Sequence, residues 1–187
     1  MPPFARQFPL DNGSVERLDD AASLSRIAHV IDAELRGITL DFQVVRTDAI
    51  IPLCKFVFKE RLLLAQKLVE QYAKQNISLF CPVSVSFSSG QKQLIAPPIL
   101  ERRDGKYILC DGMHRVYVAR QCETVNLKCL VIDRITIPLP GKPQSWGAVR
   151  VSDVQLPVER NFEDFRPEFL TWYTKAFNGL KAFSSIA

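Results

Sequence analysis

The sequence of 187 residues lacks the features of membrane-spanning and secreted chains. No apolar run approaches the roughly 18 residues that a transmembrane helix needs. The first twenty residues contain no continuous apolar stretch before the acidic residues begin, so a cleaved secretory signal is not expected either. We therefore expect a cytoplasmic protein without a transmembrane segment.

Familiar metal-binding spacings are also missing. The five cysteines are an odd number, no two of them form a Cys-x-x-Cys pair, and only two histidines, His29 and His114, are present. A zinc site of familiar spacing is therefore not supported. Most of the thiols lie in apolar stretches, where a small buried side chain is the simpler interpretation.

A strong excess of one charge, internal repeats and low-complexity tracts are absent as well. The formal net charge is +4, which is compatible with nucleic-acid or phosphate partners but too small to establish them. The length suits a single domain over residues 1–187, with a core of ordinary size.

Apolar spacing predicts a chain of mixed helices and strands. Helices are expected over 14–36, over 59–75, from about Met113 to 122, and from about Pro167 onward. Strands are expected over 38–46, 80–87, 94–103, 107–110, 125–133 and in the stretch 147–156. The strand over 125–133 becomes uniformly apolar, which is typical of a central strand buried on both faces.

The stretch 107–120, YILCDGMHRVYVAR, is the strongest candidate for a functional site. Asp111 ends a strand, Gly112 permits the positive φ of a sharp turn, and a helix begins near Met113. The free N–H groups of that first turn attract anions, and His114 and Arg115 add two donors suited to phosphate. We expect a phosphate-bearing ligand here, with Asp111 holding Mg²⁺ or a hydroxyl. The alternative is an ordinary turn followed by solvated side chains, because short motifs recur by chance.

The order of segments around this turn resembles the ParB/sulfiredoxin superfamily over residues 45–135. The shared parts are Pro98-Ile99-Leu100, the hairpin at Asp104-Gly105-Lys106, the strand 107–110, the polar turn 111–115, the helix after it and the strand 125–133. The resemblance implies a compact α+β fold, a mixed sheet flanked by helices, with added N-terminal (1–44) and C-terminal (136–187) segments containing helices. It also implies nucleotide binding through Gly112, Met113, His114 and Arg115.

Met113 departs from two activities of that superfamily. Sulfiredoxins carry Gly-Cys-His-Arg at this place, and a thioether cannot form the thiolate that their chemistry requires. Partition-type ParB proteins carry Gly-Glu-Arg-Arg, whose acid helps to hydrolyse the nucleotide, and Met113 replaces that acid too. Asp111 and Glu60 are then the candidate acids, and His114 completes the predicted catalytic set. A solvated charge at a helix start is the alternative for Glu60.

The resemblance favours Mg²⁺-assisted hydrolysis of ATP, or of another nucleoside triphosphate, together with DNA cleavage. Non-specific DNA binding is expected through the basic residues Lys92, Arg102, Arg103 and Arg120. Size and a lone ParB-like domain are similar to the plasmid-encoded fertility-inhibition and oncogenic-suppression proteins. That similarity implies a bacterial cytoplasmic protein that interferes with conjugative DNA transfer by binding a type IV secretion or coupling component. Any association with the inner membrane would then be peripheral, through that partner.

Two other functions stay open from the sequence. One is a non-catalytic inhibitory protein that binds the DNA-transfer machinery. The other is a free amino-acid kinase, in which Asp111 or Glu60 is the base on a serine-like hydroxyl. The aromatic stripe near the C-terminus, Phe162, Phe165, Phe169, Trp172 or Tyr173, Phe177 and Leu180, is interpreted as core packing or as a surface for a homodimer or partner protein.

Overall fold

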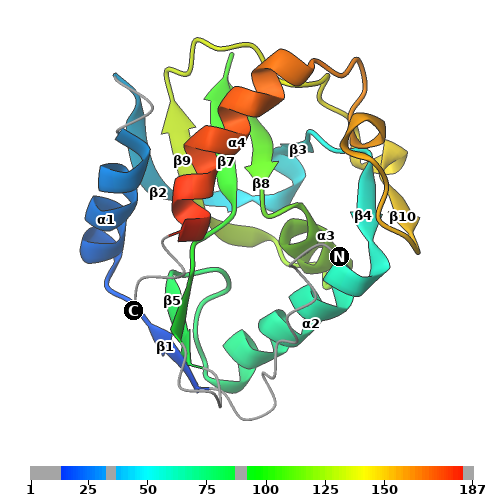
Figure 1. Cartoon of the computed structure of the whole chain (residues 1–187). Helices are drawn as coiled ribbons and strands as arrows, with labels where there is room; N and C mark the ends of the chain where they lie inside the picture. The colour runs from blue at the N-terminus through cyan, green and yellow to red at the C-terminus, as the bar shows by residue number, and fades with distance from the viewer. Residues whose placement is uncertain (1–13, 33–36, 87–91, 183–187) are drawn as a thin grey trace.

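A computed structural model describes residues 14–32, 37–86 and 92–182 (Figure 1). The helices are α1 (Asp20–Asp32), α2 (Lys59–Lys74), α3 (Met113–Gln121) and α4 (Pro167–Ala182). The strands are β1 (Ser14–Arg17), β2 (Thr39–Arg46), β3 (Ile50–Pro52), β4 (Phe56–Phe58), β5 (Val83–Ser86), β6 (Lys92–Ile95), β7 (Ile99–Arg103), β8 (Lys106–Asp111), β9 (Asn126–Asp133) and β10 (Arg150–Ser152). No helix within these described ranges combines the length and apolar character needed to cross a membrane.

The central sheet has five strands in the order β2-β9-β7-β8-β3. Strands β2 and β9 are antiparallel, β9 and β7 are parallel, β7 and β8 are antiparallel, and β8 and β3 are parallel. Helix α4 crosses one face of β9, β7 and β8, whereas α2 and α3 lie beside each other away from α4 and α1 (Figure 1). A mixed sheet flanked by helices confirms the predicted α+β class.

Strand β9 shows why the sheet is buried on both faces. Cys129 and Val131 point into the larger core cluster, which includes residues of α2 and α3. Their neighbours Leu130 and Ile132 point into a second cluster, against which Leu24 of α1 and Trp172 of α4 pack. Since successive side chains of a strand alternate between faces, a strand covered on both sides must be apolar throughout.

Two small sheets complete the described part. Strands β1, β5 and β6 form an antiparallel three-stranded sheet, and β10 pairs in parallel with β4. Strand β4 leads without a break into α2, so the β4–β10 pair fixes where α2 begins.

The predicted helix over 14–36 was wrong at its start. Residues 14–17 form β1, which pairs with β5, and Val15 is buried there. Helix α1 begins only at Asp20, and Asp19 caps it by accepting the Ala22 N–H at 2.8 Å on Oδ1. The predicted part over 33–36 lies outside the described residues.

The predicted aromatic stripe divides between a loop and a helix. Phe162 and Phe165 stack at 5.6 Å between centroids, but both precede α4. Within α4, Tyr173 is buried and Trp172 packs against the second core cluster, which favours core packing at these positions. The side chains of Phe177 and Leu180 lie outside the described residues.

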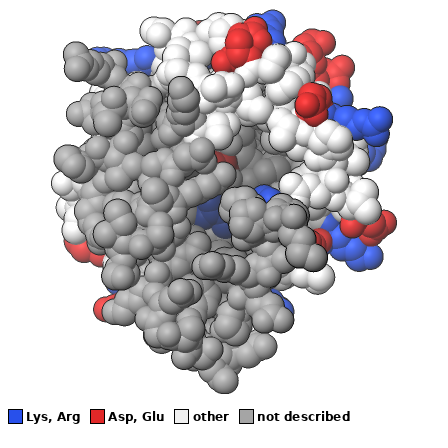
Figure 2. Space-filling view, in the orientation of Figure 1, with Lys and Arg blue, Asp and Glu red and all other residues white. Residues whose placement is uncertain are grey.

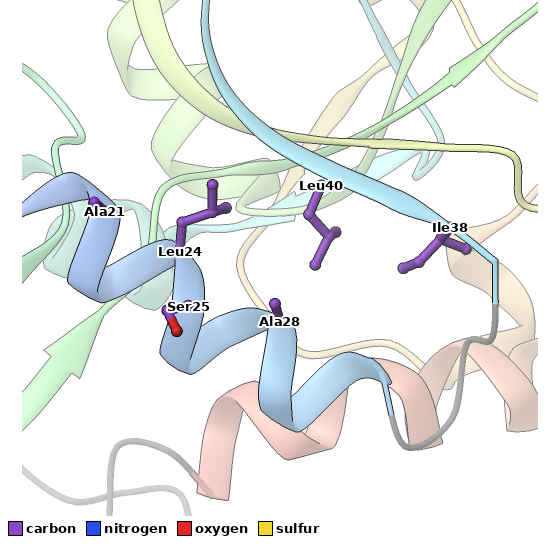
Figure 3. A pocket seen from close by; sticks show the side chains of 6 residues that line it. All are labelled: Ala21, Leu24, Ser25, Ala28, Ile38 and Leu40. Atoms are coloured by element: carbon purple, nitrogen blue, oxygen red, sulfur yellow. The ribbon is translucent and has the colours of Figure 1, made fainter.

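An apolar groove of about 440 Å³ lies between α1 and β2 (Figure 3). It is lined by Ala21, Leu24, Ser25, Ala28, Ile38 and Leu40. None of these residues belongs to β8, α2 or α3, so the groove is separate from the predicted phosphate site.

Candidate functional site

The turn between β8 and α3 has the geometry that the sequence predicts. Asp111 ends β8, Gly112 is the N-cap residue with a φ of 88°, and α3 begins at Met113. A Cβ on Gly112 would lie 3.0 Å from Pro98 Cα and 3.0 Å from Nη2 of Arg115. Both the left-handed backbone and the close approach of Pro98 therefore require glycine here.

The start of α3 presents unpaired backbone donors. Gly112 has no side chain to cap the helix, and the first bond of the helix runs from the Val116 N–H to the Gly112 carbonyl at 3.0 Å. Helix geometry leaves the N–H groups of Met113, His114 and Arg115 to a ligand or to water. The Met113 side chain is buried in the larger core cluster, so this residue offers its backbone rather than its thioether.

His114 joins the starts of two helices. Its Nε2 accepts the N–H of Phe58, the residue that precedes α2, at 3.0 Å, and the two rings lie 5.7 Å apart. Burial lowers the pKa of His114 to about 4; the charge of Arg61 adds to this effect, and Asp111 opposes it. The imidazole is therefore neutral near pH 7, with its proton on Nδ1. The ring can therefore donate one hydrogen bond to a ligand, from Nδ1. Two ring donors would require the protonated imidazole.

Arg115 is held beneath the turn. One guanidinium nitrogen donates to the Ala96 carbonyl, and another lies 3.3 Å from Asp111 Oδ2. The guanidinium carbon also lies 5.8 Å from the Phe80 ring centroid, and the side chain is only 16% exposed. Arg115 therefore contributes positive charge and rigidity to the turn, while its two terminal nitrogens each donate within the fold.

The predicted acids lie at the two neighbouring helix starts. The Asp111 carboxylate is 49% exposed, beside Arg115. Glu60 is exposed in the first turn of α2, two residues after the Phe58 amide that His114 contacts. The contact between His114 and Phe58 thus brings the helix start that carries Glu60 to the turn that carries Asp111.

Cys54 is a neighbour of the site that sequence reasoning missed. It follows β3, two residues beyond the pair Pro52–Leu109, so it comes beside Asp111 at the end of β8. Burial, followed by the charge of Asp111, raises the pKa of Cys54 to about 12. Burial likewise raises the pKa of Cys110 well above its usual value. Neither thiol next to the turn is prepared to act as a nucleophile.

The turn offers a metal ion one carboxylate ligand, that of Asp111. Within the described ranges, no group of three or more His, Cys, Asp or Glu side chains is placed to hold a metal ion. Mg²⁺ commonly uses one or two carboxylates and takes its remaining ligands from substrate phosphates and water. The donor set at Asp111 therefore fits Mg²⁺ that arrives with a nucleotide.

Two of the basic residues predicted to bind DNA are engaged on the sheet. Arg102 forms a two-pronged ion pair with Asp133, at 2.7 and 2.6 Å. Arg103 donates to the buried carboxylate of Glu101 and, at 2.6 Å, to the carbonyl of Ile137. Both guanidinium groups thus stabilise strand ends, away from the start of α3.

The other two predicted basic residues also lie outside the turn. Arg120 donates to the Thr47 carbonyl at 2.7 Å and lies 4.8 Å over the Trp146 ring. Lys92 belongs to β6, and its side chain is not among the described parts.

Basic and acidic side chains alternate along the right-hand edge of the face drawn in Figure 2. The described residues on that edge therefore form a mixed surface.

A comparison with protein families agrees with this order of elements. The model of the ParB CE domain matches residues 15–143, which is more than half of the chain and includes β7, β8, α3 and the start of α2. No curated protein and no solved structure gives a significant match. The ParB-like part of the resemblance is thereby confirmed, and the chain belongs to the ParB CE domain family.

Proposed function

We propose that this chain binds a nucleoside triphosphate at the start of α3 and hydrolyses it with Mg²⁺. The observation that carries the proposal is the Gly112 turn, which leaves the first N–H groups of α3 uncapped next to the start of α2. Such a turn offers an anion several converging backbone donors and the positive end of a helix dipole.

Each residue of the turn has a role in this proposal. The N–H groups of Met113, His114 and Arg115 donate to phosphate oxygens, and Nδ1–H of His114 is a further donor. Asp111 is the protein ligand for Mg²⁺, which when bound would supply stabilisation of the charge on the phosphates. Glu60 is exposed in the first turn of α2, the neighbouring helix, where its carboxylate is accessible to water. In this proposal it orients the attacking water as a general base.

Calorimetric titration of ATP and CTP, with and without Mg²⁺, tests the binding step. We expect the wild type to bind nucleotide, and we expect its affinity to depend less on Mg²⁺ in Asp111→Asn. In a separate assay, phosphate release should be at least tenfold slower in Asp111→Asn and in Glu60→Gln. Asp104→Asn is the matched control, because Asp104 lies in the hairpin at the opposite end of β8. A wild type that binds neither nucleotide, or phosphate release that both site variants leave unchanged, refutes the proposal.

We also propose that hydrolysis accompanies non-specific DNA cleavage and interference with conjugative DNA transfer. Family membership and the net charge of +4 support DNA as a partner. Cleavage of single- and double-stranded DNA should need Mg²⁺ and fall with Asp111→Asn, and binding should weaken steeply with salt. If Asp111→Asn still inhibits conjugation fully, the protein acts as a non-catalytic inhibitor. A phosphorylated serine-like product would identify a kinase instead.

A further inference from the structure

The start of α2 is capped by a side chain from another helix. The side chain of Phe58, its N-cap residue, has no acceptor for the N–H groups of the first turn, and the Phe58 N–H donates to His114 Nε2 at 3.0 Å. His114 lies in the first turn of α3, 56 residues later. We propose that His114 is a positioning residue whose neutral imidazole, acting as an acceptor at Nε2, holds the start of α2 against the start of α3.

The direction of this hydrogen bond fixes the tautomer. A backbone N–H can only donate, so Nε2 must carry a lone pair and the ring proton must be on Nδ1. A protonated imidazole has no lone pair, and its Nε2–H would face the N–H of Phe58. Protonation of His114 therefore breaks this contact between the two helices.

The surroundings of the ring keep it neutral. Burial of the ring, which packs against Phe58, is the main cause that lowers the pKa of His114, and the charges of Arg61 on α2 and Arg115 on α3 lower it further. The negative charge of Asp111 on β8 acts in the opposite direction and favours the cation. Burial and two cations outweigh one half-exposed carboxylate, so the imidazole is neutral and the contact is intact near pH 7.

The contact sets the spacing between two groups of helix donors. When His114 holds Phe58, the first turn of α2 stays beside the N–H groups that start α3. The effect on ligand affinity rests on the nucleotide site proposed above. The contact itself is a property of the free protein and can be measured without any ligand.

Nuclear magnetic resonance of uniformly ¹⁵N-labelled protein tests the contact directly. The chain has only two histidines, so the ring spectrum contains two spin systems and His114→Gln assigns one of them. We expect an unprotonated Nε2, a protonated Nδ1, and a coupling across the hydrogen bond to the Phe58 amide. A ring protonated on Nε2, or one that titrates near pH 6.5, overturns the inference.

Two variants separate positioning from direct ligand contact. His114→Gln keeps an acceptor and His114→Leu removes it, so Phe58 amide exchange should be about tenfold or more faster in His114→Leu and closer to wild type in His114→Gln. Affinity for ATP with Mg²⁺ should follow the same order. Equal losses of affinity with unchanged Phe58 exchange would overturn the positioning role while leaving the nucleotide site intact. A wild type that shows the contact but binds no nucleotide would support the inference and refute the proposed function.

Discussion

Replacing Gly112 with alanine should destabilise the protein through two separable effects. The left-handed backbone, with a φ of 88°, costs a residue with a Cβ about 1–2 kcal/mol. The new Cβ would also lie 3.0 Å from both Cα and Cβ of Pro98, and crowding of a packed site typically adds about 1–3 kcal/mol. We expect a loss of about 2–5 kcal/mol in the free energy of unfolding.

Gly37→Ala is a closely matched control for the first effect. Gly37 also has a φ of 88°, but its Cβ would have no atom of the described residues within 4 Å, so only the backbone cost of about 1–2 kcal/mol should remain. Urea unfolding of both variants, analysed with the same slope, gives the difference. If the two variants unfold at the same urea concentration, the turn is not packed against Pro98 and the steric part of the reasoning fails.

Three further changes test other parts of the structure. Tyr173→Phe removes the O–H that donates to Glu101 and should lower the free energy of unfolding by about 1.5–3 kcal/mol; a loss below 0.5 kcal/mol would contradict a buried bond to a carboxylate. Trp146→Phe removes the Nε1–H bond to the Ile50 carbonyl and should cost about 1 kcal/mol in the same measurement. Because the pKa of His114 falls from 6.5 to about 4 on folding, the unfolded chain binds that proton first as the pH falls. Wild type should therefore lose stability relative to His114→Gln between about pH 6.5 and pH 4, by at most about 3 kcal/mol; a flat difference would argue against a neutral buried ring.

The local elements of the site could be predicted because their causes are local. An Asp-Gly pair between an apolar strand and a helical pattern fixes the turn at Gly112, and the start of α3 at Met113 follows. The uniform apolar pattern of β9 likewise reports burial on two faces. The acceptor role of His114 could not be predicted from the sequence, since it depends on where the start of α2 lies in space relative to α3.

Strand β1 was missed because its cause is distant. Val15 is buried through pairing with Val85, seventy residues later, and nothing in residues 14–17 alone distinguishes that strand from the first turn of a helix. Asp19 was the useful local signal, since an aspartate preceding an apolar helical pattern is a strong N-cap candidate.

Glu101 shows the same limit for a charged residue. The charged run Glu101-Arg102-Arg103 contains no local sign of burial, yet Glu101 is 1% exposed in the structure. Its carboxylate is compensated by Arg103 and by the hydroxyl of Tyr173 on α4. A buried carboxylate needs such partners, and only the docking of a helix seventy residues away supplies the second one.

The pairing of β4 with β10 matters for any attempt to isolate the family domain as a fragment. The family match ends at residue 143, but β10 lies beyond it, and so does Asn161, whose carbonyl accepts the Lys55 N–H at 2.7 Å. A protein cut at that boundary would lose the ladder partner of the strand that leads into α2. Expression of residues 15–143 alone should therefore yield a chain whose α2 start is poorly fixed. A minimal fragment should extend through α4, since Tyr173 of that helix donates to the buried Glu101 carboxylate.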